Sequence, residues 1–141
     1  MPTYKHVLFA TDLAEDSDNI AKKVTKLAEL YEAKLSMVHV VEHLAAIAYS
    51  YMGSIEVEDQ LVNEARAELK KMGDLMQVAE ENRHLEVGHP KTEIIEVANR
   101  VGADLIIVGS HGPHGITALI GSTTNAIIHG ASCDVLMVRA S

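Results

Sequence analysis

Short apolar segments of strand length alternate along this chain with longer segments whose apolar residues recur at helical spacing. The run LIIV at 105–108 is mostly β-branched and too short to pack as a helix, so it predicts a strand buried on both faces. Such an alternation favours right-handed crossovers and an open, doubly wound, five-stranded parallel sheet of the α/β class, with helices on both faces. The expected strands lie at 4–11, 34–41, 85–88, 105–108 and 134–139, in one domain spanning residues 1–141.

The helices expected between these strands have recognisable ends. The first runs to about Tyr31, and the second spans about residues 56–80, with Val62, Leu75 and Ala79 widening its apolar stripe. Pro90 suits the first turn of a helix over 91–101, and Gly102 suits its C-cap. The last helix is expected to begin at residue 122 or 123 and to end near 129–130.

Composition excludes several classes of function. A formal net charge of −8 and a pI near 5.4 argue against a nucleic-acid partner or an anionic membrane surface. No run of eighteen apolar residues predicts a membrane span, and the first residues lack the pattern of a secretion signal. The single cysteine, Cys133, cannot form an internal disulfide and is interpreted as a small buried hydrophobe. These features together predict a cytoplasmic protein.

Glycines and hydroxyl residues follow the fourth expected strand. Gly109, Gly112 and Gly115 allow a sharp turn and a close approach to a ligand. The segment 121–124, GSTT, precedes a new apolar period, so Ser122 or Thr123 is expected to be the helix N-cap. A helix N-terminus carries about half a positive charge and free N–H groups, which favours an anion. The pattern matches neither the P-loop nor the G-x-G-x-x-G fingerprint, so an ordinary βα loop remains the alternative to a phosphate-binding loop.

The unusual loops after the first and fourth strands, at Asp12 and Gly109, indicate where a ligand would bind. In open α/β sheets, ligands bind beyond the carboxyl ends of the strands, where the strand order reverses. We therefore expect these two strands to be neighbours at that point.

Taken together, these motifs resemble the universal stress protein family across nearly the whole chain. The segments that carry the resemblance are KHVL and ATD at 5–12, HV at 39–40, GHP at 88–90, ADLIIVGSHG at 103–112, GST at 121–123 and CDVLMVR at 133–139. The resemblance implies a Rossmann-like, adenine nucleotide alpha-hydrolase-like fold. It also implies a homodimer that pairs its last strands through Val135, Leu136, Met137 and Val138.

The resemblance further implies the ATP-binding subgroup, because the chain keeps Gly109, Gly112 and Gly121-Ser122. Asp12 would accept hydrogen bonds from the ribose, and the Val40 backbone would meet the adenine edge. Mg²⁺ would be held by the phosphates, with no metal ligand from protein side chains. Eight residues separate Gly112 from Gly121, one fewer than the family's usual pattern, and Gly115 would let this link take a tighter path. The full set of expected nucleotide-binding residues is Ala10, Thr11, Asp12, Val40, Val108, Gly109, Ser110, His111, Gly112, His114, Gly115, Gly121, Ser122, Thr123 and Thr124.

Structural alternatives exist for the main candidates. Asp12 could be a helix-capping acid, and Ser122 and Thr123 would cap a helix with or without a ligand. His111 and His114 lie three apart in a loop with no nearby cysteine or carboxylate, which argues against zinc.

Three functions follow from these observations. The first is a regulatory, nucleotide-binding dimer in a stress response whose ATP occupancy biases an unidentified protein partner. The second is an interaction module that binds no nucleotide. The third is a slow ATPase or a self-phosphorylating protein with Ser122 or Thr123 as acceptor. Because residues 108–129 contain no lysine or arginine, charge stabilisation for phosphoryl transfer is missing there, so no catalytic residue is expected.

Overall fold

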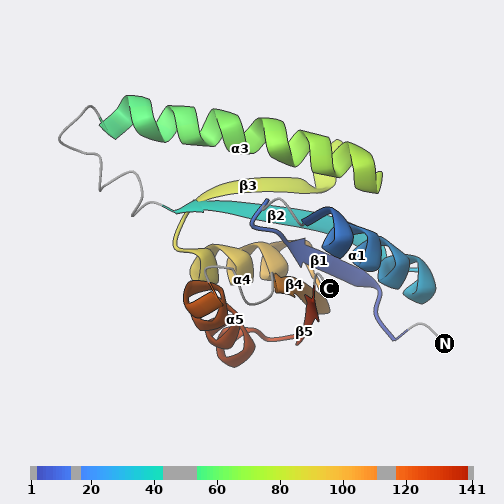
Figure 1. Cartoon of the computed structure of the whole chain (residues 1–141). Helices are drawn as coiled ribbons and strands as arrows, with labels where there is room; N and C mark the ends of the chain where they lie inside the picture. Colours follow the sequence, from blue (N-terminus) through green and yellow to red (C-terminus); the bar gives the residue numbers. More distant parts are fainter. Residues whose placement is uncertain (1–2, 14–16, 43–53, 111–116, 140–141) are drawn as a thin grey trace.

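A computed structural model describes residues 3–13, 17–42, 54–110 and 117–139 of the chain. The described elements form one parallel sheet in the order β3-β2-β1-β4-β5, with helices on both faces (Figure 1). This confirms the expected fold class and the expected adjacency of the first and fourth strands. The strands are β1 (His6–Ala10), β2 (Lys34–Glu42), β3 (Arg83–Gly88), β4 (Leu105–Ser110) and β5 (Asp134–Arg139). The described helices are α1 (Ser17–Tyr31), α3 (Ser54–Met76), α4 (Pro90–Val101) and α5 (Thr117–Gly130), with a 3₁₀ turn η2 (Glu80–Asn82).

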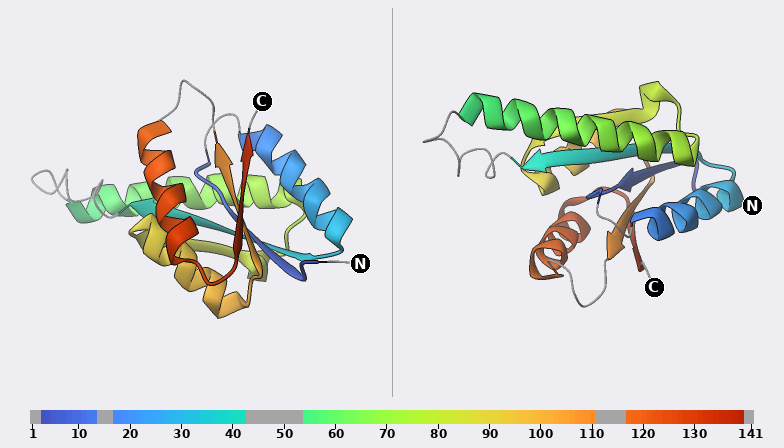
Figure 2. Two further views of the ribbon diagram at one scale, coloured as in Figure 1. Left: turned by 90° about the horizontal axis from the view of Figure 1, so that it is seen from below. Right: turned by 45° about the horizontal axis from the view of Figure 1, so that its top comes forward.

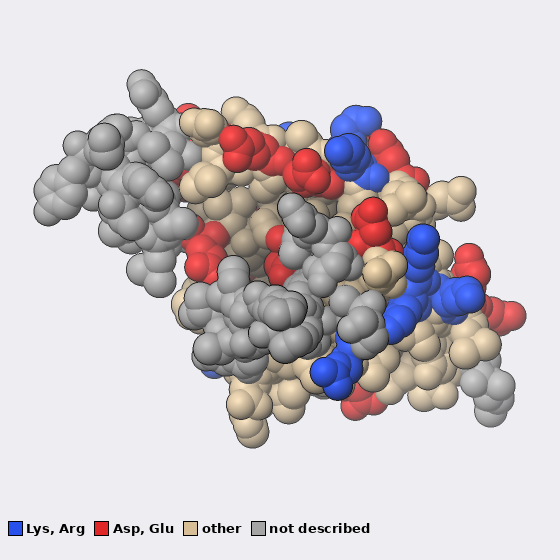
Figure 3. All heavy atoms as spheres, in the orientation of Figure 1, with Lys and Arg blue, Asp and Glu red and all other residues tan. Residues whose placement is uncertain are grey.

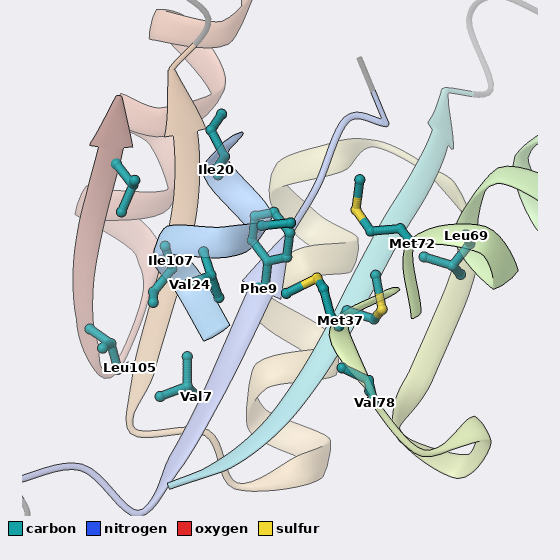
Figure 4. Packing of buried hydrophobic residues seen from close by; sticks show 13 residues of the cluster. Val7, Phe9, Ile20, Val24, Met37, Leu69, Met72, Val78, Leu105 and Ile107 are labelled. Atoms are coloured by element: carbon teal, nitrogen blue, oxygen red, sulfur yellow. The ribbon is translucent and has the colours of Figure 1, made fainter. Parts of the chain in front are cut away.

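Two apolar layers hold the sheet, one on each face. Successive residues of a strand point to opposite faces, so Val7 and Phe9 of β1 pack towards α1 and α3, whereas Leu8 packs towards α4 and α5. Figure 4 shows Phe9 beside Met37 of β2 in the first layer. Val7, Leu8 and Phe9 of β1 and Met37 of β2 are all essentially fully buried. This two-sided burial explains why the strands are continuous apolar runs.

The amino end of β1 is held by the carboxylate of Asp104. Asp104, just before β4, accepts hydrogen bonds from the backbone N–H groups of Lys5 (2.9 Å) and His6 (3.0 Å). Desolvation opposes the charged form of Asp104, but these N–H donors outweigh it and lower its pKa. The same residues set the register of β1 against β4, and this register determines which residues meet at the carboxyl ends of the strands.

The helix ends agree only in part with the expected ones. Pro90 opens α4, and Gly102 closes it in the left-handed conformation (φ 75°), as expected. The expectation that the second helix reaches residue 80 is wrong, because α3 ends at Met76. Gln77 takes a left-handed φ of 58°, and the Val78 N–H donates to the Gly73 carbonyl at 2.9 Å, which terminates the helix.

Leu75, in the last turn of α3, and Ala79, just after the helix ends, do not extend its apolar face. Leu75 is 57% exposed and Ala79 is exposed, so their expected place in the core is wrong. Val78 takes the buried position instead, because the turn at Gln77 redirects the chain towards the sheet. Residues 43–53 lie outside the part of the chain that the structure describes. Among the described helices, none is long and apolar enough to cross a membrane.

Candidate functional site

The strand order reverses at β1, which lies between β2 and β4. At its carboxyl end, Ala10 is opposite Val38 on one side and Val108 on the other. Ala10, Val40 and Val108 belong to the layer covered by α4 and α5, so the structure brings these three expected site residues to one face. Thr124 of α5 is also buried, at 7% exposure. In the left view of Figure 2, the carboxyl tips of β4 and β5 and the start of α5 lie at the same end of the molecule.

Thr11 directly follows Ala10, the last residue of β1. Its N–H donates to the Val38 carbonyl at 3.0 Å, and its side-chain Oγ1 accepts from the Leu13 N–H at 3.0 Å. Its carbonyl oxygen lies 2.7 Å from Nδ1 of His39, which must donate because a carbonyl only accepts. Thr11 is only 7% exposed, and Leu13 takes a left-handed φ of 60°. These contacts make Thr11 the support of a fixed turn.

Asp12 occupies the middle of that turn, and its side chain is exposed at the carboxyl edge of the sheet. Its negative charge acts on the nearby imidazole of His39. Burial lowers the pKa of His39, while the Thr11 carbonyl and the Asp12 carboxylate oppose that shift. The neutral imidazole therefore joins β2 to the turn that carries Asp12.

Gly109 has a packing reason to be glycine. A Cβ at this position would lie 2.6 Å from Cδ1 of Ile20, a residue of α1 that is 1% exposed. The close approach is therefore to α1, on the opposite face of the sheet from α5, and it favours a residue without a side chain at this position whether or not a ligand binds.

The expected start of the last helix is wrong. α5 begins at Thr117, so Ser122 and Thr123 lie inside the helix and neither is its N-cap. The preceding residues 118–120, Ala-Leu-Ile, include strong helix formers that extend the helix towards β4. The positive end of the helix dipole is therefore placed at Thr117, more than a turn before the GSTT segment.

Part of the expected site cannot be placed. His111, Gly112, His114 and Gly115 lie outside the described residues. Ser110, Gly121, Ser122 and Thr123 are described as members of β4 or α5, without their side chains. Within the described part of the chain, no three His, Cys, Asp or Glu side chains are grouped as a metal site would require.

Two cationic residues near the site were missed by the sequence analysis. Arg139 pairs with Ser110 in the register of β4 and β5, and Nζ of Lys23 on α1 donates to the Arg139 carbonyl at 2.7 Å. Both residues are far in sequence from the glycine-rich segment, and residues 108–129 themselves contain no lysine or arginine. Because parallel strands end at the same edge of a sheet, Arg139 at the end of the fifth expected strand could have been placed near the glycine-rich segment that follows the fourth.

β5 forms an edge of the described sheet and carries exposed apolar side chains. Leu136 is 38% exposed and Met137 is 52% exposed, whereas Val138 is 8% exposed and packs against the α1 layer. Val135 is half-buried and, like Cys133, packs against the α4 and α5 layer. The four expected dimer residues thus divide into two that complete the core and two that remain exposed.

The sheet order 3-2-1-4-5 with helices on both faces is that of the adenine nucleotide alpha-hydrolase-like class of folds. The model of the universal stress protein family matches residues 3–139, and this chain belongs to that family. It is similar to Universal stress protein A homolog 2 of Coxiella burnetii, at 42% identity over 99% of this chain and 97% of the relative. Universal stress protein MJ0531 of Methanocaldococcus jannaschii is 32% identical over 96% of this chain and 82% of its own length.

Two solved structures are also similar. The hypothetical protein MJ0577 superimposes with a TM-score of 0.78 at 26% identity, covering 96% of both chains. A universal stress protein solved in complex with cAMP gives a TM-score of 0.60 at 26% identity, covering 98% of both chains. A member of the family with this fold thus binds an adenine nucleotide.

Proposed function

We propose that this chain binds an adenine nucleotide, ATP with Mg²⁺ held by its phosphates, at the carboxyl ends of β1 and β4. The observation that carries the proposal is the fixed turn Thr11–Leu13 at the point where the strand order reverses. It presents an exposed carboxylate, Asp12, beside the strand that ends in the glycine-rich segment. Ligands in open α/β sheets bind at this position. The relative that binds cAMP gives independent support.

The described residues fit such a ligand. Ala10 and Val108 are small and apolar, which suits a flat base or ribose against the strand ends. Asp12 carries the acceptor oxygens that ribose hydroxyls need. The phosphates would then extend from β1 towards β4 and the start of α5, where backbone N–H groups and the helix dipole favour negative charge.

Binding rather than turnover is the proposed activity. Phosphoryl transfer needs charge stabilisation at the transferred group as well as a group that orients the nucleophile, and residues 108–129 contain no lysine or arginine. We propose a cytoplasmic sensor in a stress response, dimeric through β5, whose nucleotide occupancy changes its interaction with a protein partner.

The first experiment is to denature freshly purified protein, identify any released nucleotide by mass spectrometry, and titrate the emptied protein with Mg-ATP by calorimetry. Asp12→Asn removes a charged acceptor and should weaken binding by about 1.5–3 kcal/mol. Gly112→Val should abolish binding. Asp59→Asn, the same charge change on an exposed position of α3, should have no effect.

The outcomes separate the three functions. Nucleotide binding that is lost in Gly112→Val supports the sensor. ADP that accumulates from bound ATP would support slow hydrolysis. If the emptied protein binds no nucleotide at all, the interaction module becomes the better explanation, and the exposed residues Leu136 and Met137 on the β5 edge become the surface to study.

A further inference from the structure

The carboxyl end of β5 brings a guanidinium to the strand that leads into the glycine-rich segment. Arg139 is the register partner of Ser110, and Gly109 pairs with Val138 just before them. Neighbouring parallel strands lie about 4.8 Å apart. The backbone of Arg139 is therefore one strand away from the last residue of β4.

The alternation along β5 determines the face on which the Arg139 side chain lies. Val138 packs in the layer that contains Ile20 and Val24 of α1, whereas Val135 packs in the opposite layer. Because residues 135, 137 and 139 share one face of the strand, the Arg139 side chain projects on the side covered by α5. Figure 2 shows β4 and β5 ending side by side, with α5 on that side.

Lys23 holds this corner from the other side. Its ammonium donates to the Arg139 carbonyl at 2.7 Å and so joins α1 to the end of β5. Both cationic side chains are exposed, and neither forms an ion pair with any acid in the described part of the chain. Figure 3 shows Lys and Arg side chains over α1 and near β5, and both acidic and basic side chains along α3.

A polyphosphate needs local positive charge on a protein whose net charge is −8. Screening at physiological salt limits charge effects to about 8 Å, so the cations nearest the phosphates matter more than the overall charge. Residues 108–129 supply none. At the carboxyl edge, the fold supplies Arg139 and Lys23 from segments distant in sequence.

We propose that Arg139, positioned by Lys23, is the cationic group that faces the distal phosphates of the bound nucleotide and makes the site prefer ATP over AMP. This inference rests on the proposed nucleotide site. A guanidinium forms charge-assisted hydrogen bonds with phosphate oxygens, whereas the adenosine end, at β1 and β2, lies on the far side of β4 from Arg139.

The test is calorimetric titration of the emptied full-length protein with AMP and with Mg-ATP. Arg139→Gln should weaken ATP about fivefold to tenfold and leave AMP unchanged. Arg139→Lys, which keeps the charge, should retain most of the preference for ATP. Lys23→Gln should reduce the preference for ATP by a smaller factor than Arg139→Gln does. Arg66→Gln on exposed α3 makes the same charge change and should alter neither affinity. Thermal unfolding of each variant checks that it folds.

The two proposals fail in distinguishable ways. If the wild-type protein binds AMP and ATP but Arg139→Gln binds both as the wild type does, or loses both equally, the role of Arg139 is wrong and the nucleotide site stands. If the wild-type protein binds neither nucleotide, both proposals are wrong. Raising the salt from about 0.05 M to about 0.3 M should weaken ATP binding more in the wild type than in Arg139→Gln. Salt screens the attraction between the Arg139 guanidinium and the phosphates, and the variant lacks that attraction.

Discussion

Nδ1 of His39 donates a hydrogen bond of 2.7 Å to the carbonyl oxygen of Thr11 and so ties β2 to the end of β1. The bond crosses the point where the strand order reverses, and it joins two further hydrogen bonds made by the same threonine. The turn that carries Asp12 therefore depends on a neutral, partly buried histidine as well as on its own residues. This dependence can be tested.

Replacing His39 by Leu should lower the free energy of unfolding by about 1–3 kcal/mol, because the Thr11 carbonyl loses its donor in a buried position. Urea unfolding measures this loss. His89→Leu is the matched control, because His89 is exposed and its side chain makes no cap hydrogen bond to α4. Its effect should stay within about 0.5 kcal/mol. Equal losses in the two variants would show that the bond to Thr11 contributes nothing specific.

Three histidines should make the fold sensitive to mild acid. Burial lowers the pKa values of His6, His39 and His84 below the usual 6.5. The unfolded chain then binds more protons than the folded chain, so the stability present above about pH 6.5 is lost as the pH falls through the folded values. The slope is at most about 1.4 kcal/mol per pH unit for each histidine.

Neighbouring charged groups also affect how the stability depends on pH. Some change the pKa values of the histidines, and some are carboxyl groups that titrate themselves. Lys34 and Arg100 add to the shifts of His6 and His84, whereas Asp104 and Glu86 oppose them. The raised pKa of Glu93 stabilises the fold as the pH falls, with the opposite sign. Lowered carboxyl pKa values, as at Asp74, act below about pH 4.

Urea unfolding between pH 7.5 and pH 5 measures this dependence. Nε2 of His84 is buried without a hydrogen-bond partner among the described residues, so His84→Leu should flatten the slope without a cost at neutral pH. An unfolding free energy that stays constant over this range in the wild type would contradict the assignment.

Gly109 and Ile20 should show energetic coupling. Gly109→Ala places a methyl group 2.6 Å from Cδ1 of Ile20 and should destabilise the protein by about 1–3 kcal/mol through overpacking. Ile20→Val removes that terminal carbon, so it should cost less in the Gly109→Ala background than in the wild type. A double-mutant cycle measures the difference. Additive effects would mean that another feature of the strand end requires glycine.

This coupling bears on how the glycine-rich segment is interpreted. The sequence predicts Gly109 as part of a phosphate-binding loop, and the contact with Ile20 gives this position a second reason to be glycine. Sequence spacing cannot separate these two reasons, because both demand the same missing side chain.

Local patterns predicted the sheet well. The fifth strand was expected at 134–139 and is observed at Asp134–Arg139, because its boundaries follow a turn and a continuous apolar run. The start of α5 was not predicted, because hydroxyl residues at 122–124 have the composition of an N-cap, whereas the helix begins at Thr117. Helix formers before them outweighed that preference.

Long-range partners were the least predictable part of the site. Arg139 meets Ser110, and Lys23 meets the Arg139 carbonyl, through a register and a helix position that single-chain patterns do not contain. Thr11 was expected to contact the nucleotide, and its three hydrogen bonds instead suit it to positioning Asp12. The type of residue was readable from sequence, whereas the role depended on the contacts.

The β5 edge should mediate self-association. An unpaired strand edge offers free N–H and C=O groups to another strand, and Met137, 52% exposed, adds apolar surface beside it. Met137→Lys should therefore shift a dimer to monomer in sedimentation velocity, because a charge buried at the interface would be desolvated. Leu30→Lys is the matched control, since Leu30 is 77% exposed on α1. A wild-type protein that sediments as a monomer, or a dimer that survives Met137→Lys and dissociates in Leu30→Lys, would show that β5 is not the contact surface.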